Sequence, residues 1–248
     1  MTSISPDARE HLDRLRTTSA LVKQSFAEAT NSLLDHGISI VQWGDQVLQH
    51  YGYPAGICIY DFVIQDSRIE EATRLLLGHP GIEQVEPPLA AQIRGVLKTS
   101  GYYFVSKADM VTPGVYLHII AESLVHISSA GGDTAPRTSP FDPTREFLIP
   151  RLPQYCVSLV KCIQDYPEGS VDRLPARDHL FILLAAAVCR LPNVGGKILV
   201  PEELTESEES WRARQADAVR EIKTWRLPGC DEPYRSNVIE LFLSRSTG

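Results

Sequence analysis

Apolar and polar positions in the first half of the chain follow helical and extended periods in alternation. Residues 22–33 carry apolar side chains three or four positions apart, which predicts a helix that ends at Gly37. Further helical patterns cover 45–51 and 69–78, and extended apolar runs cover 38–42, 57–64, 102–106 and 115–121. This alternation predicts an α/β domain in which the last two strands are paired.

The second half of the chain is mostly helical in pattern. Helices are expected over residues 153–166, 175–190, 207–225 and 233–244. The segment 128–146 is rich in Gly, Pro, Ser and Asp, and it matches neither the helical nor the extended period. We therefore expect an α/β domain at 1–127, a linker or long loop at 128–146, and a helical domain at 147–248.

Composition and charge exclude several classes of protein. The 248 residues carry a formal net charge of −7, which disfavours a general nucleic-acid-binding surface. The longest apolar run, 180–189, is about half the ~20 residues that a membrane-spanning helix needs, so no membrane partner is expected. The first residues lack a secretory pattern, and the five cysteines are scattered without a CxxC pair. These features favour a cytoplasmic location.

One stretch resembles the signature of the nucleotidyltransferase-fold superfamily. It runs from Trp43-Gly44, through a short predicted helix, to the strand that carries Asp61. In that superfamily a strand ending in glycine, a short helix and a strand with Asp-x-Asp are followed by a third carboxylate on a later strand, and the carboxylates hold two Mg²⁺ ions. The resemblance covers roughly 21–121. It implies an α/β (α+β) fold, a nucleotidyltransferase-like mixed sheet with flanking helices, followed by a mainly helical C-terminal half.

The sequence departs from that signature at its metal ligands. Trp43 takes the place of the first glycine, Ile59 stands at the first aspartate, and Asp61 keeps the second. On the later strand the third carboxylate position falls on His118, with Glu122 at the strand end as a substitute. One carboxylate of three cannot hold two Mg²⁺ ions, so we expect no cofactor and no ordinary nucleotidyl transfer.

A carboxylate without its metal can bind a cation directly. We expect Asp61 to accept charge-assisted hydrogen bonds from a small cationic substrate such as an arginyl group, and His118 or Glu122 to move protons. The expected substrate-binding residues are Trp43, Gly44, Asp45 and Tyr60. The structural alternative is that the aspartate is a cap or surface residue and the histidine a satisfied core residue.

A second resemblance concerns function. Fungal chains of this size carry a similar Trp-Gly and Tyr-Gly-x-Pro segment, and this chain looks like the fungal arginine-containing cyclodipeptide synthases of natural-product biosynthesis. Those enzymes make a cyclic dipeptide from two aminoacyl-tRNAs, so the resemblance implies a tRNA-dependent transferase. The alternatives are a catalytically inactive binding module and a residual single-metal nucleotidyltransferase that uses Asp61 with Glu122. The oligomeric state does not follow from the sequence.

A basic strip in the predicted helix 207–225 is the candidate tRNA contact. Its cations, flanked by Trp211 and Trp225, are Arg212, Arg214, Arg220, Lys223 and Arg226. An acidic run at 202–209 precedes them. The alternative is a solvated helix, because an acidic start and a basic end both suit the helix dipole.

Overall fold

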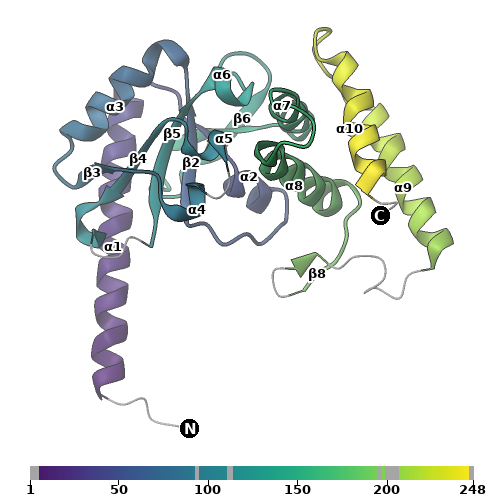
Figure 1. Cartoon of the computed structure of the whole chain (residues 1–248). Helices are drawn as coiled ribbons and strands as arrows, with labels where there is room; N and C mark the ends of the chain where they lie inside the picture. The colour runs from purple at the N-terminus through teal and green to yellow at the C-terminus, as the bar shows by residue number, and fades with distance from the viewer. Residues whose placement is uncertain (1–5, 93–94, 111–113, 195–196, 199–206, 246–248) are drawn as a thin grey trace.

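A seven-stranded mixed sheet forms the centre of the protein in the computed structural model, which describes residues 6–92, 95–110, 114–194, 197–198 and 207–245 (Figure 1). The strand order is β3-β4-β5-β2-β1-β7-β6. The strands are β1 (Val41–Trp43), β2 (Ile59–Ile64), β3 (Ile82–Val85), β4 (Tyr102–Ser106), β5 (Tyr116–Ala121), β6 (Thr134–Thr138) and β7 (Glu146–Pro150). A separate two-stranded hairpin consists of β8 (Asn193–Val194) and β9 (Lys197–Ile198). The expected mixed α/β fold class with flanking helices is confirmed.

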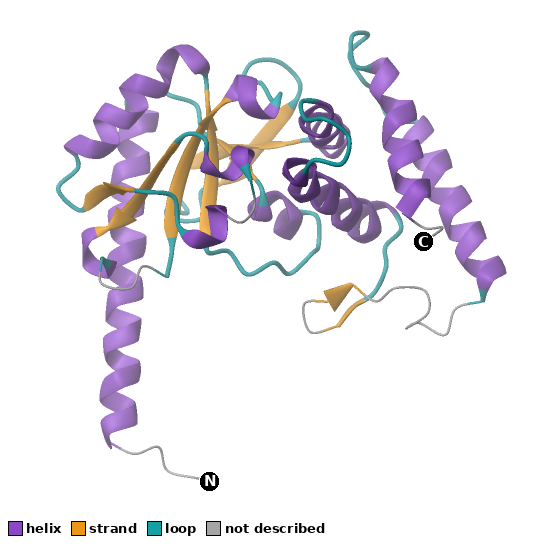
Figure 2. Cartoon of the chain, viewed as in Figure 1, coloured by secondary structure: helices purple, strands orange, loops and turns teal. Residues whose placement is uncertain are grey.

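Helices cover both faces of the sheet (Figure 2). On one face lie α1 (Pro6–Asp35) and α3 (Ile69–Gly78), and the other carries α2 (Asp45–His50), α7 (Leu152–Gln164) and α8 (Leu174–Leu183). Three one-turn helices connect strands: α4 (Leu89–Gln92), α5 (Val96–Thr99) and α6 (Glu122–Val125). The antiparallel pair α9 (Glu208–Lys223) and α10 (Glu232–Arg245) packs beyond α7. None of the helices in the described ranges has the length and hydropathy needed to cross a bilayer.

The pairing of three neighbouring strands brings Trp43, Asp61 and His118 side by side on one face of the sheet. β2 pairs antiparallel with β1 and parallel with β5, and Asp61 lies opposite Trp43 on one side and opposite His118 on the other. Paired residues share a face of the sheet, and side chains alternate between faces along each strand. Asp61 therefore points toward α2, α7 and α8, whereas its neighbour Tyr60 packs with the cluster under α1.

Residues 128–146, where a linker or long loop was expected, contribute to the central sheet. They contain β6 and reach the first residue of β7, and β7 pairs in parallel with β1, so the sheet continues through this segment. Phe141 and Phe147 are buried beneath α1. The sequence pattern missed β6 because it is an edge strand, where Pro136 is tolerated and the side chains can stay polar. The helical part of the chain begins at Leu152.

Candidate functional site

Asp61 lies at the centre of a buried ion cluster. Its Oδ2 accepts a hydrogen bond from Lys98 Nζ at 2.5 Å, and its Oδ1 accepts one from His118 Nδ1 at 2.8 Å. The three side chains are 1%, 2% and 0% exposed, respectively. We call Asp61, Lys98 and His118 the ion cluster. The cation that the sequence analysis assigned to a ligand is here supplied by a lysine of the chain itself.

The backbone of Gly44 makes room for the ion cluster. A Cβ at this position would lie 2.3 Å from Asp61 Oδ2 and 3.3 Å from Lys98 Nζ, and the glycine has a φ of 67°. Any side chain would therefore both collide with the ion pair and adopt a backbone conformation that costs L-residues energy. Gln46, on α2, fixes the strand from the same side because its Nε2 donates to the carbonyl oxygen of Asp61 at 2.8 Å. The absence of a side chain at Gly44 therefore leaves the space that the Asp61–Lys98 pair occupies.

His118 is held between two acceptors. Its Nδ1 faces Asp61 Oδ1 at 2.8 Å, and its Nε2 faces the carbonyl oxygen of Ser100 at 2.6 Å. Neither an ionised carboxylate nor a carbonyl oxygen can donate, so both ring nitrogens must carry protons for the two hydrogen bonds to form. The ring of Tyr103 stacks on the imidazole at a centroid distance of 4.0 Å. Both ring nitrogens of His118 are therefore engaged by groups of the chain itself.

The charge balance of the ion cluster keeps Asp61 ionised. Burial alone raises the pKa of its carboxyl, but Lys98 and His118 outweigh burial and lower that pKa to about 2. Lys98 Nζ also lies 5.2 Å from the centroid of the Trp43 ring, which adds a cation–π contact. The ion cluster therefore contains an ionised carboxylate held by an ammonium and an imidazole ring.

The sequence analysis did not identify Lys98. It lies on the one-turn helix α5, 37 residues after Asp61, and this spacing matches no motif. The hydrogen bond from the Tyr103 hydroxyl to the Lys98 carbonyl oxygen, at 2.5 Å, ties this helix to β4. The side chain consequently reaches back over the sheet from a separate element, and no local periodicity signals such a contact.

A pocket opens beside the ion cluster, between α2, the loop that follows it and α8. Its volume is about 610 Å³. It is lined by Asp45, Leu48, Tyr53, Pro54, Ala55, Gly56, Lys98, Val171, Leu174, Pro175, Asp178, His179 and Ile182. We call it the α2–α8 pocket. It brings Asp45, the first residue of α2, and Lys98 to one cavity whose wall is polar and apolar in nearly equal parts.

A chain of hydrogen bonds orients Asp45 in the pocket. His179 Nε2 lies 3.2 Å from Asp45 Oδ1, and His179 Nδ1 lies 3.4 Å from the Tyr155 hydroxyl, which in turn accepts from the Gly44 amide at 3.1 Å. Burial raises the pKa of Asp45, but the hydrogen bond and charge of His179, together with Lys98, bring it below the ordinary value. Asp45 is therefore ionised at neutral pH.

The structure gathers some of the residues expected at the site and separates others. Trp43, Gly44 and Asp45 adjoin the ion cluster or the pocket, as described above. Tyr60 points to the opposite face, where its ring lies 4.7 Å from that of Phe141. Glu122 begins α6, and its Oε1 accepts from the Ser129 amide at 2.6 Å. It stands four residues beyond His118, or roughly 13 Å along an extended chain.

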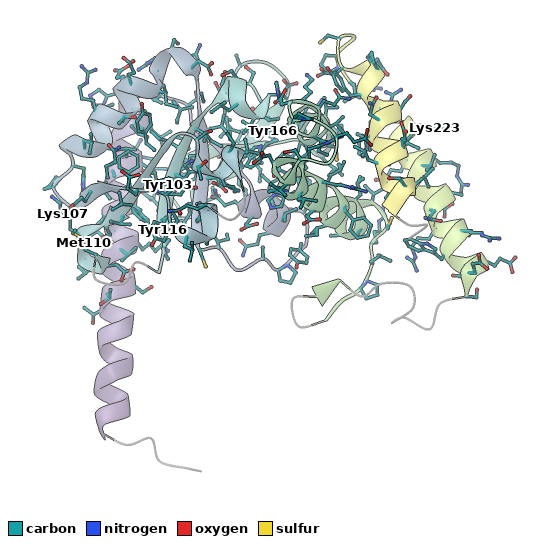
Figure 3. The ribbon with its side chains drawn as sticks, viewed as in Figure 1. Tyr103, Lys107, Met110, Tyr116, Tyr166 and Lys223 are labelled. Carbon is teal, nitrogen blue, oxygen red and sulfur yellow. The ribbon has the colours of Figure 1, made fainter. Side chains whose placement is uncertain are left out.

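The basic strip lies on and just after α9, away from the pocket lining. Arg212 pairs with Glu208 at 2.5 Å, Arg220 pairs with Asp217, and Arg214 donates to the Cys189 carbonyl oxygen at 3.1 Å. Lys223, labelled in Figure 3, and Arg226 are exposed. The two tryptophans expected to assist the strip, Trp211 and Trp225, instead pack against the core beneath α9.

The three residues that the resemblance assigned to metal positions, Ile59, Asp61 and His118, include a single carboxylate. Both oxygens of Asp61 have partners within the chain, Ile59 offers no ligand, and His118 directs both ring nitrogens at acceptors. Across the described ranges, no group of three or more His, Cys, Asp and Glu side chains is arranged to hold a metal ion.

Comparisons with known proteins add little to this geometry. No protein-family model matches the chain, and no curated protein matches it. Among solved structures, it is similar to the solution structure of the antibiotic-resistance factor ANT(2'')-Ia, described as showing substrate-regulated conformation dynamics. The two chains are 8% identical, the TM-score is 0.39, and the similarity covers 82% of this chain and 97% of that one. A TM-score this low carries no argument about function, which has to come from the site.

Proposed function

We propose that this chain has a nucleotidyltransferase-like architecture in which metal-dependent transfer has been replaced by metal-independent binding of a small molecule in the α2–α8 pocket. The order of elements supports the architecture: β1 ends at Trp43-Gly44, α2 follows, β2 carries Asp61, and β5 lies beside it. The observation that carries the proposal is the 2.5 Å contact between Lys98 Nζ and Asp61 Oδ2.

An internal ammonium at this point takes the electrostatic role of a bound cation. The lone carboxylate is already surrounded by Lys98 and His118. An incoming divalent ion would meet both positive charges and would have to displace the lysine from a buried pair. Breaking such a pair costs about 3–5 kcal/mol, because one charge is left in the interior without its partner. Metal binding is therefore opposed by the fold itself.

Residual single-metal transfer is less well supported. It requires Glu122 to join Asp61, yet Glu122 caps the Ser129 amide from the start of α6. Its strand position lies well beyond the residue opposite Asp61. One-metal chemistry would need both carboxylates on the same ion.

The tRNA-dependent transferase, including synthesis of an arginine-containing cyclic dipeptide, rests on the resemblance alone. Three of its candidate tRNA contacts on α9 already bind groups of the chain itself, namely Arg212, Arg214 and Arg220. Incubating the protein with charged tRNA and measuring products by mass spectrometry tests this activity. A cyclic dipeptide whose formation is lost in Arg212→Glu/Arg220→Glu would favour the transferase over a binding module.

The proposal is tested by titrating MgCl₂, with and without ATP, into the purified chain by calorimetry. We expect no Mg²⁺-dependent binding of the ion or of the nucleotide. Asp61→Asn should leave that result unchanged, and Asp217→Asn on exposed α9 serves as the matched control. Magnesium-dependent nucleotide binding that disappears in Asp61→Asn but persists in Asp217→Asn would overturn the proposal.

A further inference from the structure

A second cavity lies between α2 and the edge strand β6, with a volume of about 350 Å³. Seven of the nine residues that line it are polar, and none of the nine lines the α2–α8 pocket. We call it the α2–β6 cavity. We infer that it binds a small anion that also carries hydroxyl groups. Arg137 contacts the anionic group, and the buried glutamines Gln42 and Gln46 contact the hydroxyl groups.

Arg137 gives the α2–β6 cavity a positive charge, and none of the lining residues is acidic. Within the described ranges, no carboxylate lies at ion-pair distance from the Arg137 guanidinium, whereas Arg145 and Arg212 on the same protein have such partners. His50 adds no charge at neutral pH, because burial and then the charge of Arg137 lower the pKa of its imidazole below the ordinary 6.5. A guanidinium presents a planar set of donors that matches a carboxylate or a phosphate. The cavity therefore favours an anionic group.

Gln46 supplies a buried acceptor that the described chain leaves without a donor. Its Nε2 donates to the Asp61 carbonyl oxygen at 2.8 Å, and because a carbonyl oxygen cannot donate, this bond fixes which end of the amide faces the strand. The Oε1 at the other end is buried, and no described group donates to it. The side chain is 5% exposed and lines the cavity. A hydroxyl group of a ligand can donate to this oxygen and satisfy it.

Gln42, on β1, brings a second buried amide to the same cavity. It is also 5% exposed, and the described part of the chain offers no hydrogen-bond partner to its side chain. Its amide can both donate and accept, as a hydroxyl group does. Buried amides are normally paired, and one that is unpaired costs free energy that a ligand can recover. Two such amides in a cavity with one guanidinium therefore select an anion that carries hydroxyl groups over a simple anion.

Four probes of six carbon atoms test the inference by calorimetry or ligand-observed NMR: gluconate, glucose 6-phosphate, sorbitol and hexanoate. Sorbitol keeps the hydroxyl groups of gluconate without its charge, and hexanoate keeps the carboxylate without the hydroxyl groups. We expect gluconate or glucose 6-phosphate to bind at least about tenfold more tightly than sorbitol and hexanoate. The tighter of the two hydroxylated anions identifies the anionic group as a carboxylate or a phosphate.

Three variants assign the contacts. Arg137→Gln should weaken binding of the tighter anion at least about tenfold, because it removes the charged side chain from the cavity lining. Arg74→Gln, a matched change of an exposed arginine on α3, should leave the affinity unchanged. Gln42→Leu should weaken binding at least about threefold without lowering the urea midpoint of unfolding, since no described group pairs with the amide that it removes.

The outcomes separate this inference from the proposed function. Sorbitol or hexanoate binding as tightly as the hydroxylated anions, anion binding unaffected by Arg137→Gln, or no binding by any probe would each overturn the inference. A lower unfolding midpoint in Gln42→Leu would show that the amide has a structural partner, which overturns its assignment to the ligand. These results leave the proposed function untouched, because it concerns the α2–α8 pocket, which shares no lining residue with this cavity.

Discussion

Asp61 and His118 stand directly opposite each other on the adjacent parallel strands β2 and β5, and a 2.8 Å hydrogen bond joins Oδ1 of the first to Nδ1 of the second. This strand pair therefore places a carboxylate beside an imidazole. Lys98 completes the neutralisation from a third element. The following predictions test how the ion cluster stabilises the fold.

Lys98→Met is expected to destabilise the protein by about 3–5 kcal/mol, because it leaves the buried carboxylate of Asp61 without its strongest partner. Urea denaturation followed by circular dichroism measures the loss. Lys223→Met, an exposed lysine on α9, is the matched control and should change stability by less than about 0.5 kcal/mol. The double variant Asp61→Asn/Lys98→Met should recover part of the loss, and similar small losses in both lysine variants would show that the pair is not a structural element.

Stability should fall with acid through the titration of Asp61. Its pKa is lowered from 3.8 to about 2 in the folded state, so the unfolded chain binds more protons in that interval. The contribution is complete above about pH 4 and is lost as the pH falls through about 2; its size is roughly 2 kcal/mol. Measuring the free energy of unfolding from pH 5 to pH 2 in the wild type and in Asp61→Asn tests this. Equal acid slopes in the two proteins would contradict the assignment.

Gly44→Ala should be more harmful than the equivalent change at Gly37, another glycine with a positive φ. Gly44 and Gly37 have φ values of 67° and 69°, but a Cβ at Gly37 meets nothing within 4 Å, whereas one at Gly44 meets Asp61 Oδ2. Gly37→Ala should cost about 1–2 kcal/mol of backbone strain. Gly44→Ala should cost about 1–3 kcal/mol more, since the ion pair must shift. Thermal denaturation of both variants gives the comparison, and equal losses would show that the close approach is not real.

His118 should donate a hydrogen bond through each ring nitrogen in the folded chain. The ¹⁵N chemical shifts of its Nδ1 and Nε2 should both lie in the imidazolium range, because both face acceptors in the interior. His36, which is exposed on the surface after α1, provides the reference ring in the same spectrum. A shift typical of an unprotonated nitrogen at either position of His118 would contradict the arrangement described for the ion cluster.

Local sequence patterns were sufficient for most of the elements around the site. Helical spacing predicted the helices from α7 to α10, and extended runs predicted β1, β2, β4 and β5 to within a few residues. The strands β3, β6 and β7 of the central sheet were missed. β3 is short, and β6 is a polar edge strand that contains Pro136, so neither carries the apolar alternation by which strands are recognised.

The sequence by itself determined that Ile59 offers no metal ligand, whatever the fold. It also placed Asp61 and His118 on two predicted strands. Only the tertiary structure decided that Lys98 neutralises Asp61, that Asp45 rather than Asp61 lines the pocket, and that Tyr60 and Glu122 lie elsewhere. The reason is physical: periodicity reports which face of its own element a side chain occupies, whereas the pairing of buried charges depends on distances between elements that meet only in the folded chain.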